Sequence, residues 1–539
     1  MTIEVPTREG AFLRGMRWSP EGAGRAPVVL VLTPYGADAY HPDGTAFAAA
    51  GFHFVSLDVR GRGDSDGTFR PFVHDGADGH DAVRRLAAQE WSSGDVLLYG
   101  GSYSGFAQWA VAATRPPGLR AIAPVASVFP GVDFPMAHGI PKSFAARWLT
   151  LVDGRRMNNG PFADDALWAE AGERLIATGR PFRDLDLVAV GRRLPAFQEW
   201  LDHPTLDAYW DALVPTPEQY AGISVPVLTI TGQYDDDQLG ALTHHDRHVR
   251  AVPGARHDVV IGPWDHAATR SGGRRFGGLT FAEASSIDLR ELHIGWYRWV
   301  LGLGERPAFL ADRVTYFHVG EDRWRAAPDL PGGTGLRLHP VADHGLTPEA
   351  PTEHRRLTLL LDPATAGAPE RAQPPAHRVF TDDRPFALPA GPGTAVHVTA
   401  PFTSPVDVTG RPAASLTLSS ALPDFDLLAG IHVLPAEGSP RLLAEAALRA
   451  RHHAGTPWPA DHPVRVELRD FPFVSQRLEP GDRLALVLRA PHRRWQPNFQ
   501  SGAPVSAETL ADATAGEVHI LQGPSHTSYL TLPAAGGMP

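Results

Sequence analysis

A serine flanked by glycines carries the strongest chemical signal in the sequence. Ser102 lies in the segment GGSYSG at 100–105, which follows an apolar run and precedes a stretch compatible with a helix. At such a strand-to-helix turn the serine backbone is strained, and small neighbours let the two elements approach closely. The hydroxyl then projects above the sheet, where the first N–H groups of the helix can stabilise an oxyanion. The pattern indicates a nucleophilic serine.

The spacing of this motif departs by one residue from the usual Gly-x-Ser-x-Gly. Position 104 is a serine, and the second glycine is Gly105. On the motif alone, a glycine-rich turn with solubilising serines is the alternative. Ser104 is the rival nucleophile, but it has no glycine two residues before it, so Ser102 is preferred.

A nucleophilic serine needs a base, and the base needs an orienting carboxylate. In α/β hydrolases the acid and then the base follow the serine, each in a loop after a later strand. The apolar run at 225–231 is followed by Asp235, and the run at 258–262 is followed by His266. Because carboxyl ends of successive parallel strands meet at one sheet edge, these two residues are the predicted acid and base. Asp265 is a competing acid, although a sequence neighbour usually points elsewhere.

The chain has 25 histidines, so most of them must be structural or exposed. Those without a comparable placement include His244, His245, His248, His257, His452 and His453.

The elements that would position these residues follow an alternating pattern at the start of the chain. Apolar runs at 26–34, 52–59 and 96–99 are typical of strands buried on both faces, and the stretch at 78–90 has helical spacing. Strand–helix–strand repetition predicts an α/β layer architecture. The pattern returns with the runs at 225–231 and 258–262 and with a helix at 287–303.

Two other zones differ from this pattern. Residues 128–222 show helical spacing without a strand-like run, which predicts a helical insertion. From about 310 onward, short alternating runs are separated by turn residues, which is typical of an antiparallel β-sandwich. These runs lie at 314–319, 356–361, 414–419, 428–434, 482–489 and 518–523.

Composition excludes several functional classes. The 539 residues are 43% hydrophobic and 20% charged, which is ordinary for a folded protein. A net charge of −11 argues against binding to nucleic acid or to an anionic membrane. The absence of cysteine excludes disulfides, zinc–thiolate sites and a cysteine nucleophile. With no apolar run long enough to span a membrane and no apolar h-region at the start, we expect a cytoplasmic protein. Lys142 is the only lysine.

In their order along the chain, these segments resemble one family: the cocaine-esterase-like and X-Pro dipeptidyl-peptidase-like (CocE/NonD) serine hydrolases, which include the α-amino acid ester hydrolases. The resemblance spans nearly the whole chain, and this family also uses Gly-x-Ser-Tyr-x-Gly. In the first half the matching pieces are TPY at 33–35, DVRG at 58–61, Ser65-x-Gly67, the serine motif, Tyr234-Asp235 and GPWDH at 262–266. Later pieces are YF at 316–317, RW at 323–324, PDFD at 423–426, LRAR at 448–451 and PNF at 497–499.

The resemblance implies a role for each matching residue. Ser102 would be the nucleophile, His266 the general base and Asp235 its orienting acid. Tyr35 would donate its phenol to the oxyanion, and the backbone N–H of Tyr103 would be the second donor. A strand-end aromatic that packs on a turn is the alternative for Tyr35.

The fold we expect is an α/β-hydrolase core with an inserted helical cap and a C-terminal β-sandwich of jelly-roll type. We assign residues 1–127 and 223–308 to the core, 128–222 to the cap and 309–539 to the jelly roll.

Weaker candidates surround this predicted triad. Asp236 and Asp237 either cap the next helix or bind a substrate ammonium group, as extra carboxylates do in the amino acid ester hydrolases. Trp264 is a further candidate for substrate binding. The Gly61-x-Gly63 segment lacks the spacing of a dinucleotide-binding loop. A metal site could also be imagined at the start of a helix, where acids are favoured anyway; its ligands would be Asp75, Asp78, His80 and Asp81.

We therefore predict a serine hydrolase that cleaves an acyl ester of a small molecule through an acyl-enzyme, with no metal or cofactor. An aminopeptidase or X-Pro dipeptidyl-peptidase acting on amides is the first alternative, and transfer of the acyl group to an acceptor other than water is another. A non-catalytic binding protein on a hydrolase scaffold is the alternative from a different class. The sequence leaves homo-oligomer formation open.

Overall fold

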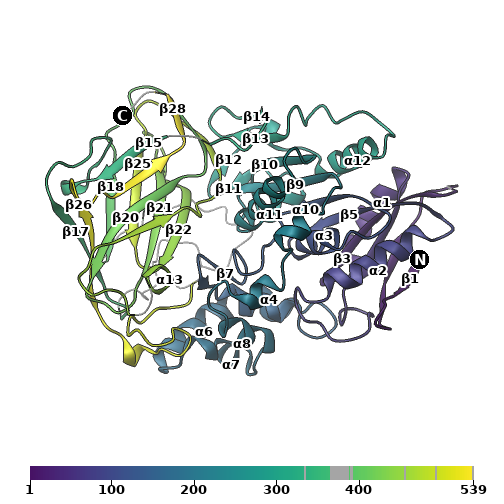
Figure 1. Cartoon of the computed structure of the whole chain (residues 1–539), viewed down its shortest axis with the longest axis horizontal. Helices are drawn as coiled ribbons and strands as arrows, with labels where there is room; N and C mark the ends of the chain where they lie inside the picture. Colours follow the sequence, from purple (N-terminus) through teal and green to yellow (C-terminus); the bar gives the residue numbers. More distant parts are fainter. Residues whose placement is uncertain are drawn as a thin grey trace.

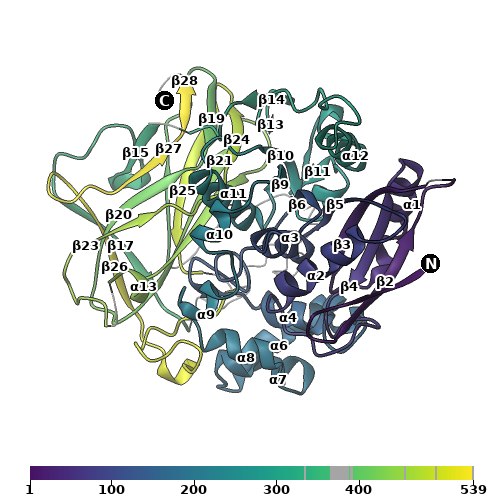
Figure 2. The same cartoon turned by 45° about the vertical axis from the view of Figure 1, so that its right-hand side comes forward.

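A computed structural model describes residues 1–22, 24–332, 335–364, 388, 393–454, 457–491 and 495–536. It contains an α/β core, a group of cap helices and a C-terminal β-domain. In Figure 1 the core occupies the right-hand side, the β-domain the left, and the cap helices the space below and between them. Figure 2 shows the same arrangement after rotation. The predicted fold class, an α/β hydrolase with a C-terminal β-sandwich, is confirmed.

The core is built on one mixed sheet of ten strands. From β4 to β13 neighbouring strands are parallel, and the pairs β1–β2, β2–β4 and β13–β14 are antiparallel. In spatial order the strands are β1 (Thr2–Pro6), β2 (Phe12–Trp18), β4 (His53–Asp58), β3 (Ala26–Thr33), β5 (Ser92–Gly101), β6 (Leu119–Val125), β9 (Val227–Tyr234), β10 (His257–Asp265), β13 (Val314–His318) and β14 (Arg323–Ala327).

Helices cover both faces of this sheet, which explains the continuous apolar runs. In β3, Val28 and Leu30 pack with α2 (Asp75–Ala87) and α3 (Tyr103–Ala113) in one core cluster. Val29 and Val31 pack with α1 (His41–Ala49) and α12 (Leu289–Val300) in another cluster. Successive side chains of a strand point to opposite faces, so a strand buried on both sides must be apolar throughout. Helix α11 (Gln238–Ala251) packs beside β9.

The structure corrects one strand assignment. The run at 314–319 is β13, and it pairs in parallel with β10 of the core sheet, so the prediction that it belongs to the sandwich is wrong. A short strand alone does not encode which sheet it joins, because any partner with unpaired backbone groups can accept it. Strand β6, between the serine motif and the cap, has no counterpart among the predicted strands.

The segment between β6 and β9 is mainly helical, as predicted, although it also holds the short hairpin β7 (Met136–Ala137) and β8 (Ile140–Pro141). Its helices are α4 (Phe144–Leu151), α5 (Asn159–Ala163), α6 (Asp165–Ala177), α7 (Leu185–Val190), α8 (Pro195–Leu201), α9 (Ala208–Asp211) and α10 (Pro217–Ala221). Figures 1 and 2 both place α4, α6, α7 and α8 together at the lower end of the core.

The C-terminal domain consists of antiparallel sheets that share one apolar core. Leucines of β20 and β21 meet in that core, which identifies a sandwich of facing sheets. Its strands are β15 (Leu336–Pro340), β16 (Leu346–Thr347), β17 (Arg355–Leu361), β18 (Thr394–Val398), β19 (Val406–Gly410), β20 (Ala413–Ser420), β21 (Asp426–Leu434), β22 (Arg441–Arg449), β23 (Val464–Leu468), β24 (Val474–Leu478), β25 (Arg483–Arg489), β26 (Gly516–Gln522), β27 (Tyr529–Leu532) and β28 (Ala534–Gly536), with the short helix α13 (Arg451–Ala454).

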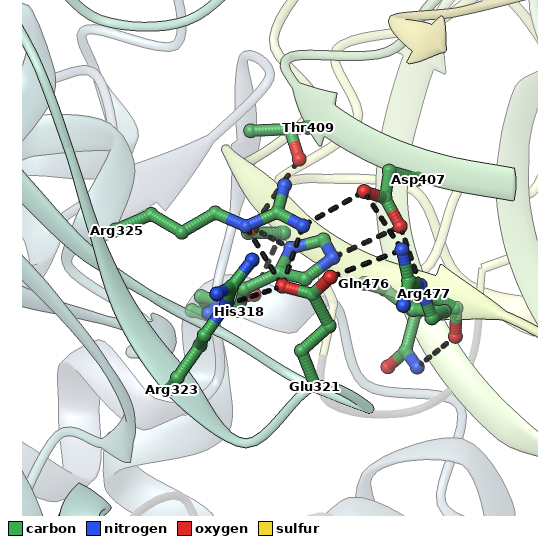
Figure 3. Close-up of polar contacts among 10 residues, drawn as sticks. His318, Glu321, Arg323, Arg325, Asp407, Thr409, Gln476 and Arg477 are labelled. Carbon is green, nitrogen blue, oxygen red and sulfur yellow. Dashed lines mark hydrogen bonds and ion pairs between the residues drawn. The ribbon is translucent and has the colours of Figure 1, made fainter. Parts of the chain in front are cut away.

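An ion-pair network joins the core sheet to this sandwich (Figure 3). Asp407 of β19 pairs with Arg325 of β14 at 2.8 Å and with Arg477 of β24 at 2.8 Å. Glu321 pairs with the same two arginines and with Arg323. Several charges that share partners hold a contact better than isolated surface pairs do. The network therefore fixes the sandwich against the edge of the core sheet.

Among the described residues, no helix has the length and apolar character needed to cross a bilayer.

Candidate active site

Ser102 stands on a tight turn between a strand and a helix. Strand β5 ends at Gly101, helix α3 begins at Tyr103, and Ser102 between them has φ 60° and ψ −122°. This backbone conformation is strained for a residue with a side chain, as a nucleophile elbow requires. Gly100 has φ 126°, and a Cβ there would come within 2.7 Å of Ser104 Cβ.

The shifted second glycine has a packing reason. A Cβ on Gly105 would lie 2.9 Å from the carbonyl oxygen of Val125 and 3.0 Å from Cα of Ser127. The first turn of α3 therefore presses against the end of β6 at position 105, while position 104 tolerates a serine. Ser104 is buried and does not line the cavity described below, which removes it as the rival nucleophile.

The predicted acid and base meet at the ends of neighbouring strands. Asp235 follows β9, His266 follows β10, and Nδ1 of His266 lies 2.8 Å from Oδ1 of Asp235. Thr231 donates its hydroxyl to the other carboxylate oxygen at 2.7 Å. Burial alone would raise the pKa of Asp235, but the neighbouring His266 and these hydrogen bonds outweigh it and lower the pKa. An ionised Asp235 holds the proton of His266 on Nδ1 and leaves Nε2 as the acceptor.

Tyr35 brings a phenol to the nucleophile. It follows β3, the neighbour of β5 in the sheet, and its hydroxyl contacts both Ser102 and the indole of Trp148. The indole N–H of Trp148 donates to the Tyr35 oxygen at 3.2 Å. Burial raises the pKa of Tyr35 to about 12, so the phenol keeps its proton at neutral pH and stays a donor.

Tyr103 offers its backbone rather than its hydroxyl. As the first residue of α3 it has an N–H without an acceptor inside the helix. Its hydroxyl is buried, donates to Asp75 at 2.8 Å and accepts the N–H of Phe72 at 3.0 Å. The side chain therefore anchors the loop that carries Phe72.

Ser102, Tyr35 and His266 line one cavity of about 500 Å³. The cap helices α4 and α5 and the residues around them form its opposite wall, and aromatic side chains dominate its surface. The other lining residues are Tyr40, Phe72, Gly101, Tyr103, Val128, Phe134, Lys142, Phe144, Trp148, Leu151, Met157, Asn159, Phe162, Asp236, Asp237, Ala267 and Arg270. A cavity of this size and lining suits a small molecule with a bulky apolar group.

The two acids after Asp235 face this cavity. Asp237 is at the N-cap position of α11, yet its side chain makes no capping hydrogen bond. Its Oδ2 lies 3.4 Å from Nδ1 of His266. Burial raises the pKa of Asp237 well above its ordinary value. Asp236 also lines the cavity. Trp264 does not: it is fully buried and donates its indole N–H to the carbonyl of Ser285 at 3.2 Å. The prediction that Trp264 binds substrate is therefore wrong.

Asp235, Asp237 and His266 have ligating atoms within 4.8 Å of one another, a spacing that would also suit one metal ion. Asp235 already accepts hydrogen bonds from Thr231, His266 and the N–H of Asp237. These hydrogen bonds suit a carboxylate that orients an imidazole. We therefore interpret Asp235 and His266 as an acid–base pair rather than as metal ligands.

The competing candidates have structural partners. Asp265 accepts the N–H of Ala268 at 2.8 Å. Asp78 and Asp81 pair with Arg60 and Arg8. His244 is buried between Tyr220 and the carbonyl of Val128.

Sequence reasoning missed several polar residues of the cavity, among them Trp148, Lys142 and Arg270. Trp148 and Lys142 come from the cap, where helical spacing says nothing about which side chains face the core. Arg270 lies four residues after His266 on the 3-10 helix η3 (Ala268–Arg270), and this proximity is a signal that could have identified it.

Comparisons with known proteins cover both halves of the chain. The family model of the X-Pro dipeptidyl-peptidase (S15 family) matches residues 9–268, and that of the X-Pro dipeptidyl-peptidase C-terminal non-catalytic domain matches residues 311–531. Cocaine esterase from Rhodococcus sp. is 27% identical over 583 residues, which covers 98% of this chain and 97% of the esterase.

Solved structures show the same fold. An aminopeptidase from the marine sediment archaeon Thaumarchaeota archaeon is similar with a TM-score of 0.86 and 20% identity, covering 99% of this chain and 96% of the other. An α-amino acid ester hydrolase is similar with a TM-score of 0.86 and 21% identity, with the same coverage of 99% and 96%.

Proposed function

This chain belongs to the cocaine-esterase-like and X-Pro dipeptidyl-peptidase-like serine hydrolases, and we propose that it hydrolyses a carboxylic ester through an acyl-enzyme on Ser102. The observation that carries the proposal is the 2.8 Å contact between His266 Nδ1 and Asp235, with His266 lining the same cavity as Ser102. A buried acid, an imidazole and a strained serine in this order are the parts that nucleophilic acyl transfer needs.

In the first half-reaction, Ser102 Oγ attacks the ester carbonyl and gives its proton to Nε2 of His266. The carbonyl oxygen becomes an oxyanion, which the phenol of Tyr35 and the backbone N–H of Tyr103 stabilise. The imidazolium, held by Asp235, then gives its proton to the leaving alcohol. In the second half-reaction, His266 takes a proton from water, the hydroxide attacks the acyl-enzyme, and Ser102 regains its proton.

The lining of the cavity supports a substrate with an aromatic or other bulky apolar group. Trp148, Phe134 and Phe72 form a connected cluster, with ring centroids of Phe134 and Trp148 5.1 Å apart. Aromatic walls favour a flat apolar ligand through burial of area and edge or face contacts.

A second candidate is the hydrolysis of an aminoacyl ester or amide, as in an aminopeptidase. It is favoured by Asp236 and Asp237, two acidic side chains that line the cavity and could bind a free ammonium group. A screen of 4-nitrophenyl esters against aminoacyl 4-nitroanilides separates these candidates.

The first test is covalent labelling by a fluorophosphonate probe together with hydrolysis of 4-nitrophenyl butyrate. We expect the wild type to label and to hydrolyse the ester, and Ser102→Ala to do neither while keeping its circular dichroism spectrum. Ser104→Ala is the matched control, because this buried serine lies outside the cavity, and it should still label. A wild-type protein that neither labels nor turns over would overturn the proposal in favour of a binding protein.

A further inference from the structure

Arg270 is a cation placed directly on the predicted general base. Its Nη2 lies 3.3 Å from Nε2 of His266, and its Nη1 donates to the backbone carbonyl of the same residue at 2.5 Å. Both contacts come from a residue that lines the cavity and whose side chain is exposed to solvent. Nε2 is the atom that must accept the proton of Ser102.

Gly101 makes room for this guanidinium. A Cβ on Gly101 would lie 2.8 Å from Nε and 2.9 Å from Nη2 of Arg270, so the group occupies the space that any side chain at 101 would fill. The guanidinium thus packs against the residue that precedes Ser102. Because Gly101 has no side chain, the space beside it is free for the guanidinium of Arg270.

Arg270 has no acidic partner among the residues that the structure describes, although arginines elsewhere are widely ion-paired. Two of its five N–H donors are directed to His266, and the 3.3 Å contact to Nε2 is long for a hydrogen bond. A planar guanidinium with unused donors matches a carboxylate in a bidentate way. The contact to Nε2 is therefore easily exchanged for a stronger one.

We propose that Arg270 is a specificity-determining residue that binds a carboxylate on the alcohol portion of the substrate and, in doing so, releases Nε2 of His266. This inference rests on the proposed ester hydrolysis at Ser102. The leaving-group oxygen is the atom to which Nε2 returns the proton, so a guanidinium beside Nε2 lies next to the leaving alcohol. A carboxylate there pairs with Arg270, and the lone pair of Nε2 becomes available to the hydroxyl of Ser102.

Most of the other charged groups in and beside the cavity are compatible with an anion. Asp235 is engaged by His266, and the raised pKa of Asp237 favours its neutral form. Lys142 adds a second cation to the lining and lies near Asp237. Its ammonium group is 6.0 Å from the ring centroid of Trp495. Asp236 is the remaining acid of the lining.

The test compares two butyrate esters of matched shape: 4-carboxyphenyl butyrate, whose leaving group is anionic, and 4-carbamoylphenyl butyrate, whose leaving group is neutral. We expect the wild type to favour the carboxyl ester in kcat/KM by about 10- to 100-fold, the range of a charge-assisted hydrogen bond. In Arg270→Gln this preference should fall to about 1, and 1 M NaCl should weaken it in the wild type.

Two further variants separate position from charge. Arg275→Gln removes an exposed cation five residues away, outside the cavity, and should keep the wild-type preference. Gly101→Ala keeps the charge of Arg270 but displaces its guanidinium, and should reduce the preference as Arg270→Gln does. Fluorophosphonate labelling of each variant at Ser102 shows whether its site is assembled.

A binding measurement makes the outcome independent of turnover. By calorimetry, 4-hydroxybenzoate should bind the wild type about 10-fold or more tightly than 4-hydroxybenzamide, and Arg270→Gln should lose this difference. Equal binding of the two compounds, or a preference that survives in Arg270→Gln, would overturn the role of Arg270 while ester hydrolysis stands. Failure of the proposed function is distinct, because the protein would then neither label nor hydrolyse either ester, while the calorimetry would still decide whether Arg270 binds a carboxylate.

Discussion

Two tyrosines lie close to the candidate nucleophile, and we expect their changes to phenylalanine to differ in effect. Tyr35→Phe should mainly lower activity, and Tyr103→Phe should mainly lower stability. Tyr35 directs its phenol to Ser102, whereas Tyr103 directs its phenol away, to Asp75 and the N–H of Phe72. Tyr35→Phe removes an oxyanion donor and should lower kcat about 10²- to 10³-fold, or about 3–4 kcal/mol of transition-state stabilisation. Its cost in stability should be about 1 kcal/mol, since the hydroxyl loses only the hydrogen bond from Trp148 and its contact with Ser102.

Tyr103→Phe keeps the backbone N–H and should leave kcat within a few-fold of the wild type. It deprives two buried groups of a partner, the carboxyl of Asp75 and the N–H of Phe72, at about 1–3 kcal/mol each. Burial raises the pKa of Asp75 to about 7, so this carboxyl can take up a proton, and the total should be about 2–4 kcal/mol. For an α/β unit of this size, that corresponds to a melting point lower by roughly 5–15 °C.

The assay is steady-state hydrolysis of 4-nitrophenyl butyrate together with thermal unfolding followed by tryptophan fluorescence. Because the chain has more than one domain, the first transition is the one to compare. The reasoning is refuted if Tyr35→Phe keeps its full kcat, or if Tyr103→Phe loses 100-fold in kcat without a change in melting. Either result would mean that the two phenols have been assigned the wrong roles.

Three other predictions follow from the described contacts. Asp235→Asn should lower kcat about 10⁴-fold on 4-nitrophenyl butyrate, because an amide no longer holds the Nδ1–H tautomer of His266; a loss under 10-fold would argue against Asp235 as the orienting acid. Burial lowers the pKa of His244 to about 3 from 6.5, so the unfolded chain binds the extra proton and stability falls as the pH drops below 6.5. Between pH 7 and pH 5 the wild type should lose about 2 kcal/mol more than His244→Gln in urea unfolding, and parallel pH profiles would contradict this. Asp407→Ala should lower the melting point by a few degrees at low salt by breaking the network between core and sandwich, and the difference should shrink in 1 M NaCl; a salt-independent effect would point to packing instead.

Much of the fold could be predicted because it depends on local pattern. The run at 26–34 is apolar at every position, and β3 is indeed covered on both faces. The helix expected at 78–90 is α2 at Asp75–Ala87, where its acidic first turn favours the helix start. Strand β13 was misplaced because its partner, β10, is more than fifty residues away, and pairing at such a distance leaves no mark in a five-residue run.

The candidate site, too, has residues that local sequence pattern locates and contacts that depend on distant parts of the chain. Ser102, Asp235 and His266 could be located from sequence because each follows a recognisable strand, and parallel strands bring their carboxyl ends to one edge. Trp264 was misassigned because successive residues of a strand point to opposite faces, and its face is the core. The proximity of Arg270 to His266 in the sequence could have marked it as a candidate, but the direction of its side chain could not be predicted, because a long, flexible side chain is oriented by the space that its neighbours leave.

By itself the sequence determined the alternation of strands and helices in the core, the strained turn at Ser102 and the succession of serine, acid and histidine, since these follow from residue size, backbone preference and periodicity along the chain. Only the tertiary structure decided what surrounds the nucleophile. The indole of Trp148 on Tyr35, the carboxylate of Asp237 beside His266 and the guanidinium of Arg270 on Nε2 depend on which cap and loop side chains share one cavity. Such contacts join residues distant in the chain, and packing in three dimensions selects among side-chain directions that the local sequence leaves equal.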